Sequence, residues 1–280
     1  MEKKNDWSLE LSEYIKQGEP SKVEKTKMWE TAIGLQAVDG LEPSKYLIKT
    51  AKEHIEGNIN IDEVKKRITE YYEAENSRKD YEKESEEADK VAVRITEILS
   101  EKTFNFSPTE MLNIHKRLFT GIIDKAGEFR DYNFTKKEWV LNGDTVIYSS
   151  FESIKDTLEY DFEQERNFSY RDLGLEESIK HLCRFTANIW QIHPFCEGNT
   201  RTTAVFIIKY LRTFGFNIND EVFAEIRKSF NASSCVSSNL WYLNGYWICA
   251  LSIYHAGWWC YRYPWDDRFL PCKSRWSFNW

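Results

Sequence analysis

The sequence lacks three features that would each point to a class of function. Its 280 residues carry a formal net charge of −7 and no long basic stripe, which argues against a nucleic-acid-binding protein. Its six cysteines include no Cys-x-x-Cys pair, so neither a zinc site nor a dithiol redox motif is indicated. No apolar segment follows the charged residues at the start, and without such a signal peptide we expect a cytoplasmic protein.

Apolar residues at helical spacing are abundant. Hydrophobic residues make up 41% of the chain, enough for one substantial core or for two domains. Residues 22–76 are predicted to form three short helices and residues 77–101 one charged helix, while strand-like runs are confined to one place. The expected fold is therefore all-α with a single β-hairpin.

The strand-like region is 138–148, where two β-rich runs flank Asn142-Gly143. Asn-Gly is the preferred centre of a tight type I′ turn, so these runs predict an antiparallel hairpin. A single hairpin in a helical protein has unpaired edges, to which an extended peptide can add as a further strand. The alternative is a structural hairpin that packs on the helices.

The most informative stretch is residues 193–202, His-Pro-Phe-Cys-Glu-Gly-Asn-Thr-Arg-Thr, between two apolar helical patterns. Pro194 should exclude His193 from the α region and so end the first helix. Gly198 and the two residues after it should open the second helix, whose unpaired N–H groups and positive dipole end attract phosphate. The stretch therefore predicts a phosphate-binding loop in a stiff frame.

Three side chains of this loop suit phosphoryl chemistry. Histidine is the natural general base near neutral pH, which assigns that role to His193. Glu197 offers a carboxylate oxygen of the kind that Mg²⁺ takes together with substrate phosphates. Arg201 supplies a permanent planar charge suited to phosphate oxygens. The alternative is a solvated loop in which these residues have no chemical role.

The loop resembles the motif of the Fic family, HPFx[D/E]GN[G/K]RxxR, from His193 through Arg201, with Thr200 at the Gly/Lys position. The resemblance implies a helical bundle whose hairpin flap clamps a target peptide. It also implies transfer of AMP from Mg-ATP to a Ser, Thr or Tyr hydroxyl of a target protein. The family's second arginine would fall at Ala204, which leaves open both the nucleotide orientation and the inhibition that depends on that arginine.

The resemblance also implies a role for each residue of the motif. His193 would take the proton from the attacking hydroxyl, and Glu197 would hold Mg²⁺. The backbone at Gly198 and the Asn199 side chain would hold the α-phosphate of ATP, and Arg201 the outer phosphates. The residues expected to bind ATP are Gly198, Asn199, Thr200 and Arg201, and those expected in the target-docking flap are Val140, Leu141, Thr145 and Val146.

Two other functions remain open at this point. The same loop carries out phosphate or phosphocholine transfer in relatives, so a different phosphoryl or phosphodiester transfer is one alternative. A non-catalytic toxin remnant is the other.

Residues 20–76 resemble the VbhA-type antitoxin domain that is found beside Fic domains, chiefly over residues 32–43. The inhibitory motif of that family is [S/T]xxxE[G/N]. Aligned on Gly40, its acidic position is Asp39 and its Ser/Thr position is Leu35. Asp39 is therefore the candidate inhibitory residue, and the alternative is that it simply ends a helix.

Two residues outside the loop also need an interpretation. His115 lies in an apolar helical pattern and is expected to be a packing residue rather than a ligand. Arg130 ends the run Gly-Glu-Phe-Arg, which resembles the G-x-[FY]-R element of the family, near the target-docking face. The alternative for Arg130 is an ordinary surface or ion-pair arginine.

The composition changes abruptly after about residue 225. No charged residue occurs between Lys228 and Arg262, and seven of the eleven tryptophans lie from Trp241 onward. The uncharged run 237–261 is long enough to span a membrane, but its polar residues make it a poor lipid-facing segment. We favour a tail read from a shifted reading frame over a divergent folded cap. The expected division is an antitoxin-like segment at 20–76, a Fic-like catalytic domain at 77–225 and the anomalous tail at 226–280.

Overall fold

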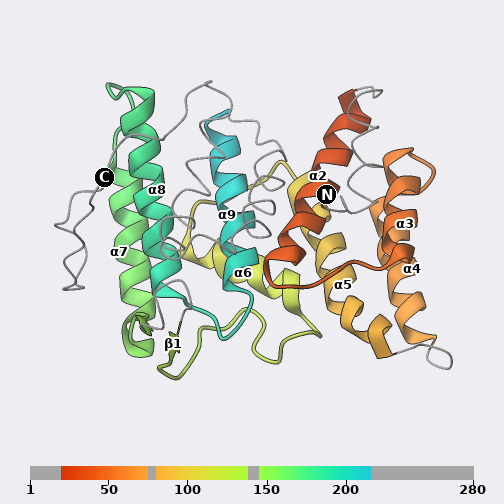
Figure 1. Cartoon of the computed structure of the whole chain (residues 1–280). Coiled ribbons are helices and arrows are strands. Elements are labelled where there is room, and N and C mark those ends of the chain that lie inside the picture. The colour runs from red at the N-terminus through yellow and green to blue at the C-terminus, as the bar shows by residue number, and fades with distance from the viewer. Residues whose placement is uncertain (1–19, 75–79, 138–144, 216–280) are drawn as a thin grey trace, which may run out of the picture.

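The computed structural model describes residues 20–74, 80–137 and 145–215, which form an all-α fold with one short hairpin (Figure 1). Helix α9 contacts α5, α6 and α8, so the element that follows the candidate loop lies inside the bundle. The helices are α2 Pro20–Val38, α3 Lys45–Ile55, α4 Ile61–Glu73, α5 Asp80–Ser100, α6 Pro108–Phe119, α7 Ile154–Asn167, α8 Leu175–Ile192 and α9 Asn199–Thr213, with a 3-10 turn at Phe151–Ser153 and strands β1 Thr135–Lys137 and β2 Thr145–Ile147.

The helix starts coincide with capping side chains. Ser44 accepts a hydrogen bond from the N–H of Leu47 at 3.0 Å, which satisfies one of the donors that the first turn of α3 leaves unpaired. Asn60 and Ser107 cap α4 and α6 in the same way, at 2.8 and 3.1 Å. The three short helices expected over 22–76 are confirmed.

One hydrophobic core joins α2–α4 to the helices that follow them. Trp29, Ile33 and Leu35 of α2 are fully buried, in the same cluster as Ile95 of α5 and Phe206 of α9. Residue 76, the expected domain boundary, falls between α4 and α5, and that division stays a prediction.

A buried carboxylate ties the first helices to α5. Asp89 of α5 is 0% exposed and accepts hydrogen bonds from the Ser44 N–H at 2.9 Å, the Ser44 hydroxyl and the Tyr72 hydroxyl at 2.8 Å. Burial raises the pKa of Asp89 to about 6, against the lowering effect of these three donors. The N-terminus of α3 and the face of α4 are therefore fixed to the same point of α5.

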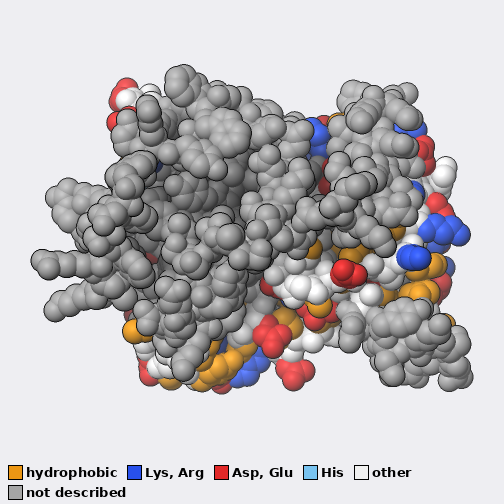
Figure 2. Space-filling view, viewed as in Figure 1, with side chains coloured by type: hydrophobic (Ala, Val, Ile, Leu, Met, Phe, Trp, Pro, Cys, Tyr) orange, Lys and Arg blue, Asp and Glu red, His pale blue; other side chains and the backbone are white. Residues whose placement is uncertain are grey.

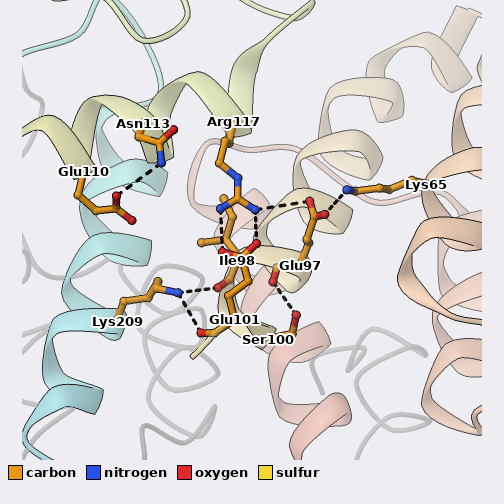
Figure 3. A network of polar contacts seen from close by, with 9 residues as sticks. All are labelled: Lys65, Glu97, Ile98, Ser100, Glu101, Glu110, Asn113, Arg117 and Lys209. Atoms are coloured by element: carbon orange, nitrogen blue, oxygen red, sulfur yellow. Dashed lines mark hydrogen bonds and ion pairs between the residues drawn. The ribbon is translucent and has the colours of Figure 1, made fainter. Parts of the chain in front are cut away.

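A second polar network surrounds the C-terminal end of α5 (Figure 3). Lys209 of α9 is 3% exposed and donates to the carbonyls of Ile98 and Glu101 at 2.9 and 3.0 Å. Arg117 of α6 pairs with the Glu101 carboxylate, and Lys65 of α4 pairs with Glu97. The negative end of the helix dipole favours a cation at these carbonyls, although Ile98 also accepts from the Glu101 N–H at 3.3 Å.

The hairpin is present, and its first strand begins earlier than the sequence predicts. Thr135 faces Ile147 and Lys137 faces Thr145, so Phe134 and Tyr148 continue the pairing, with their rings 5.0 Å apart. A two-residue turn centred on Asn142-Gly143 would instead place Thr145 opposite Val140. The aromatic cross-strand pair sets this register at the base of the hairpin.

The surface of the described part mixes charges of both signs. Figure 2 shows Lys or Arg side chains beside Asp or Glu side chains over the face that α3 and α4 form. Among the described residues, no helix is long and apolar enough to cross a membrane. The uncharged run 237–261 and the rest of the tail lie outside the described residues.

Candidate active site

The catalytic candidate His193 follows directly after the last residue of α8. Its backbone has φ 51° and ψ 64°, and it is the only non-glycine residue with positive φ among those described. Pro194 does end the helix here, as expected, but it leaves His193 in the left-handed region rather than in an extended one. Such a conformation is costly for a residue with a side chain and persists only when the surroundings hold it.

The two legs of the hairpin flank the imidazole of His193. The Tyr148 ring stacks on it at a centroid distance of 4.2 Å and an interplanar angle of 26°. The Phe134 ring meets it edge-on at 5.6 Å. The side chain that the sequence assigns as general base is therefore positioned by the base of the flap as well as by α8.

Gly198 is the N-cap of α9, where a side chain would be strained. Its φ is 70°, and a Cβ atom would lie 2.4 Å from the Phe119 ring of α6. The backbone N–H groups of Asn199, Thr200 and Arg201 form the first turn of α9, where helical hydrogen bonding leaves donors unpaired. Loop and helix together therefore have the geometry of an anion-binding corner, and phosphate binding there stays a prediction.

The Asn199 side chain binds the backbone of the loop that precedes it. Its Oδ1 accepts from the Phe195 N–H at 2.9 Å, and its Nδ2 donates to the Phe195 carbonyl at 2.7 Å. Both ends of the amide are thus bound to the loop backbone. In the described conformation Asn199 shapes the loop, and the direct phosphate contact expected of its side chain stays a prediction.

His115 of α6 packs against the loop and also forms hydrogen bonds with its backbone, which goes beyond the packing role expected for it. Its ring stacks on Phe195 at 3.8 Å, its Nδ1 accepts from the Gly127 N–H at 2.8 Å, and its Nε2 lies 3.1 Å from the Glu197 carbonyl. Since Nδ1 accepts, we assign the proton to Nε2, which donates to Glu197. Burial lowers the pKa of His115 to about 4, so this neutral form persists at neutral pH.

Glu197 is the expected Mg²⁺ ligand. Its side chain is exposed on the loop, beside the start of α9, while His115 fixes its carbonyl. No group of three or more His, Cys, Asp or Glu side chains that could hold a metal occurs among the described residues. A single carboxylate fits Mg²⁺, which protein sites commonly hold by one or two carboxylates together with substrate phosphates.

Arg201 is buried, and its guanidinium group contacts three polar side chains, although Nε itself makes no hydrogen bond. Its side chain is 5% exposed. Nη1 donates to Gln36 Oε1 at 3.1 Å, Nη2 donates to Glu87 Oε1 at 2.7 Å, and Nε forms an ion pair with Asp39 Oδ2 at 2.6 Å. The guanidinium carbon also lies 4.8 Å from the centroid of the Phe119 ring. In this conformation two carboxylates neutralise the arginine that was expected to hold the outer phosphates.

Asp39 therefore meets an arginine other than the family's second arginine. That arginine is absent at Ala204, which is 9% exposed on α9. The acid at the end of α2 instead reaches Arg201, within the loop motif itself. The sequence identified the acidic residue but not this partner.

Of the four residues expected in the flap, Thr145 and Val146 lie in β2, opposite Lys137 and Lys136. Val140 and Leu141 lie outside the described residues. The end of β2 is fixed to α8, because the exposed Gln191 side chain donates to the Ile147 carbonyl at 2.9 Å.

Sequence reasoning missed four residues around the loop: Gln36, Glu87, Phe134 and Tyr148. The sequence did carry a signal for Gln36: it is a polar residue on the apolar face of α2, one helical turn after Ala32. Glu87 directly precedes Ala88 at the border of the apolar face of α5, although the charges of this helix were expected to be solvated. The two aromatic residues had no signal, because their contact with the loop depends on the hairpin register.

Comparison with known proteins places the loop in a family. Residues 105–211 match the model of the Fic/DOC family. Protein adenylyltransferase VbhT of Bartonella schoenbuchensis is 28% identical over 114 residues, which cover 41% of this chain and 23% of VbhT. The ribonucleoside-diphosphate reductase small chain of Ostreid herpesvirus 1 is 29% identical over 119 residues, 39% of this chain and 20% of that protein. The chain thus spans less than a quarter of the length of these curated relatives.

Solved structures of Fic proteins also resemble the chain. The N-terminal FIC domain of Bep8 from Bartonella sp. 1-1C aligns with a TM-score of 0.45 and 17% identity, over 63% of this chain and 88% of that one. A FIC domain containing signaling protein from Bacteroides thetaiotaomicron aligns with a TM-score of 0.46 and 16% identity, over 89% and 96%. The family match begins after α5, so the antitoxin-like interpretation of residues 20–76 stays a prediction. Residues 105–211, which carry the His193–Arg201 loop, are a Fic/DOC family domain.

Proposed function

We propose that this chain is a protein adenylyltransferase that transfers AMP from Mg-ATP to a hydroxyl side chain of a target protein. The observation that carries the proposal is the shape of the 193–199 loop. His193 at the end of α8 and the first turn of α9 lie at the two ends of one short loop, which Asn199 and His115 brace from within. The name of VbhT and the match to the Fic/DOC family support the same reaction.

In the proposed reaction, His193 accepts the proton of the attacking hydroxyl as its oxygen bonds to the α-phosphorus of ATP. The bond to the β-phosphate oxygen breaks, and pyrophosphate leaves. The N–H groups at the start of α9 stabilise the charge that develops on the α-phosphate. Glu197 would hold Mg²⁺, which supplies neutralising charge to the phosphates when bound.

ATP labelled at the α-phosphate tests the proposal directly. The intact chain and its His193→Ala variant are incubated with Mg-ATP and a cell extract that supplies protein acceptors. Label on protein that depends on His193, with an adduct mass equal to AMP, is the expected result. If protein is labelled only by ATP that carries the label at its γ-phosphate, the reaction is phosphoryl transfer rather than AMP transfer. No label in either experiment, from the folded intact chain and from its Asp39→Asn variant alike, would reject the proposal.

We further propose that the described conformation is a resting state in which Asp39 inhibits the site. The outer phosphates of ATP and the carboxylates of Asp39 and Glu87 compete for one guanidinium group. Nucleotide can bind Arg201 only where those acids give way. Substitution of Asp39 should therefore increase both nucleotide affinity and the label transferred in the experiment above.

A further inference from the structure

Arg130 is buried between the candidate loop and the hairpin. It lies two residues before Tyr132, where the chain enters the first leg of the flap, and only 2% of it is exposed. Its backbone N–H donates to the Pro194 carbonyl at 2.9 Å. The alternative interpretation of Arg130 as an ordinary surface arginine is therefore wrong.

The guanidinium group of Arg130 binds four backbone carbonyls from three parts of the chain. Nε donates to the His193 carbonyl at 2.8 Å, and Nη2 donates to the Ile192 carbonyl at 3.2 Å. Nη1 donates to the Tyr132 carbonyl at 2.7 Å, on the first leg of the flap. Nη2 also donates to the carbonyl of Ser149, which follows the second leg. The end of α8 and both legs of the flap thus meet on one side chain.

These contacts account for the left-handed conformation of His193. The last carbonyls of a helix have no partner within it, and a cation near them is favoured by the helix dipole. Arg130 binds two such carbonyls at the end of α8, one of them belonging to His193 itself. The strained residue is therefore held from its own carbonyl as well as by the stacked rings of the flap.

Only arginine has the geometry for this position. Its planar fork carries five N–H donors in fixed directions, whereas lysine has one nitrogen at the end of a flexible stem. The guanidinium carbon also lies 5.3 Å from the centroid of the Phe134 ring, one of the two rings that flank His193. A lysine would keep the charge and lose the simultaneous contact with the three segments.

We infer that Arg130 is a positioning residue that holds both legs of the flap at a fixed place relative to His193. The function of this coupling rests on the proposed transfer reaction: a hydroxyl presented by a peptide on the flap then meets the imidazole in one geometry. A misplacement of about 1 Å between reacting groups can cost about 100-fold in rate. The coupling itself is a property of the unliganded chain and can be measured without any transfer.

The test compares Arg130→Lys with Arg117→Lys in the full chain. Arg117 also uses its fork, but to bind carboxylates at the far end of α5 (Figure 3). Hydrogen exchange followed by mass spectrometry reports the backbone amides of residues 132–137 and 145–150, and NMR of labelled histidine reports the His193 imidazole. In Arg130→Lys we expect at least tenfold faster exchange in both legs and a shifted His193 signal, with exchange in α2 and α5 unchanged. Arg117→Lys should change neither the legs nor His193.

Unchanged legs in Arg130→Lys, or equal acceleration throughout both variants, would overturn the inference. Should Arg130→Lys fail to fold, a protease site inserted between Asn142 and Gly143 gives a second test. Each leg is bound to Arg130 on its own, so both should keep their protection after cleavage. Loss of protection in the legs on cleavage would refute the proposed role. If the chain transfers no AMP, the proposed function is rejected, but the inference that Arg130 positions the legs of the flap is unaffected.

Discussion

The ion pair between Asp39 and Arg201 allows a prediction in which affinity and stability change in opposite directions. The perturbation is Asp39→Asn, which keeps the size of the side chain and removes its charge. Under the proposed competition, the phosphates of ATP no longer have to displace a carboxylate from Nε of Arg201. Nucleotide affinity should therefore rise, although the folded state loses an interaction.

The magnitude follows from the burial of the two partners. Arg201 is 5% exposed and Asp39 is 32% exposed, so the pair lies between a buried and a surface ion pair. Nε of Arg201 and Oδ2 of Asp39 lie 2.6 Å apart, but Nε makes no hydrogen bond, so Asp39→Asn removes charge attraction alone. A partly exposed ion pair of this kind contributes about 1 kcal/mol. About 1.4 kcal/mol corresponds to a tenfold change in an equilibrium constant. We therefore expect about fivefold tighter binding of Mg-ATP and a loss of about 1 kcal/mol in the free energy of unfolding.

Isothermal titration calorimetry measures the affinity, in a His193→Ala background so that no transfer consumes ATP. Urea titration of the same proteins gives the free energy of unfolding. Glu87→Gln should act in the same direction, because Glu87 binds the other side of the guanidinium group. Glu56→Gln is the matched control, since Glu56 pairs with Lys22 on the exposed surface of the same segment. Unchanged or weaker Mg-ATP binding by both Asp39→Asn and Glu87→Gln would refute the competition.

Three other positions test the frame around the loop. Gly198→Ala should lower the free energy of unfolding by about 2–4 kcal/mol in urea titrations, because of its φ of 70° and the Phe119 ring 2.4 Å from a new Cβ; a loss below 1 kcal/mol would contradict this contact. Lys209→Met should lower it by about 1.5–3 kcal/mol, because the carbonyls of Ile98 and Glu101 at the end of α5 lose a charged donor, and a neutral effect would contradict the cap. Burial lowers the pKa of His115 to about 4 in the folded state. As pH falls from 6.5 toward 4, the unfolded chain therefore takes up a proton that the folded chain does not, and the folded state loses stability. His115→Gln should therefore flatten the stability profile between pH 6.5 and 4 by up to about 1.4 kcal/mol per pH unit, and an unchanged slope would contradict the neutral brace.

Features encoded by neighbouring residues could be predicted from the sequence. The caps at Ser44, Asn60 and Ser107 lie three residues from the N–H groups they accept, so a short window of sequence contains the whole interaction. The end of α8 could be predicted for the same reason, because Pro194 lies two residues after its last residue. The motif at 193–201 could be identified because its residues are consecutive in the chain.

Features that depend on residues far apart in the chain could not be predicted in this way. The left-handed conformation of His193 involves Arg130, 63 positions earlier, and the partners of Arg201 lie 165 and 114 positions away. The hairpin register follows from Phe134 and Tyr148, which lie beyond the turn that the sequence singled out. In each case the sequence shows a residue with a suitable side chain, and only the fold shows its partner.

The burial of α2 in the common core has a consequence for how such a protein could be controlled in a cell. Trp29, Ile33 and Leu35 cannot leave the core without exposing it, so Asp39 is carried on a helix that stays attached. Where an inhibitor is a separate chain, its concentration relative to the enzyme sets activity, and selective degradation of the inhibitor releases the enzyme. Here the acid and the arginine are synthesised together at a ratio of one to one. Under the proposed inhibition, changes in expression level would therefore leave the inhibited fraction constant, and release would require a local rearrangement at the end of α2.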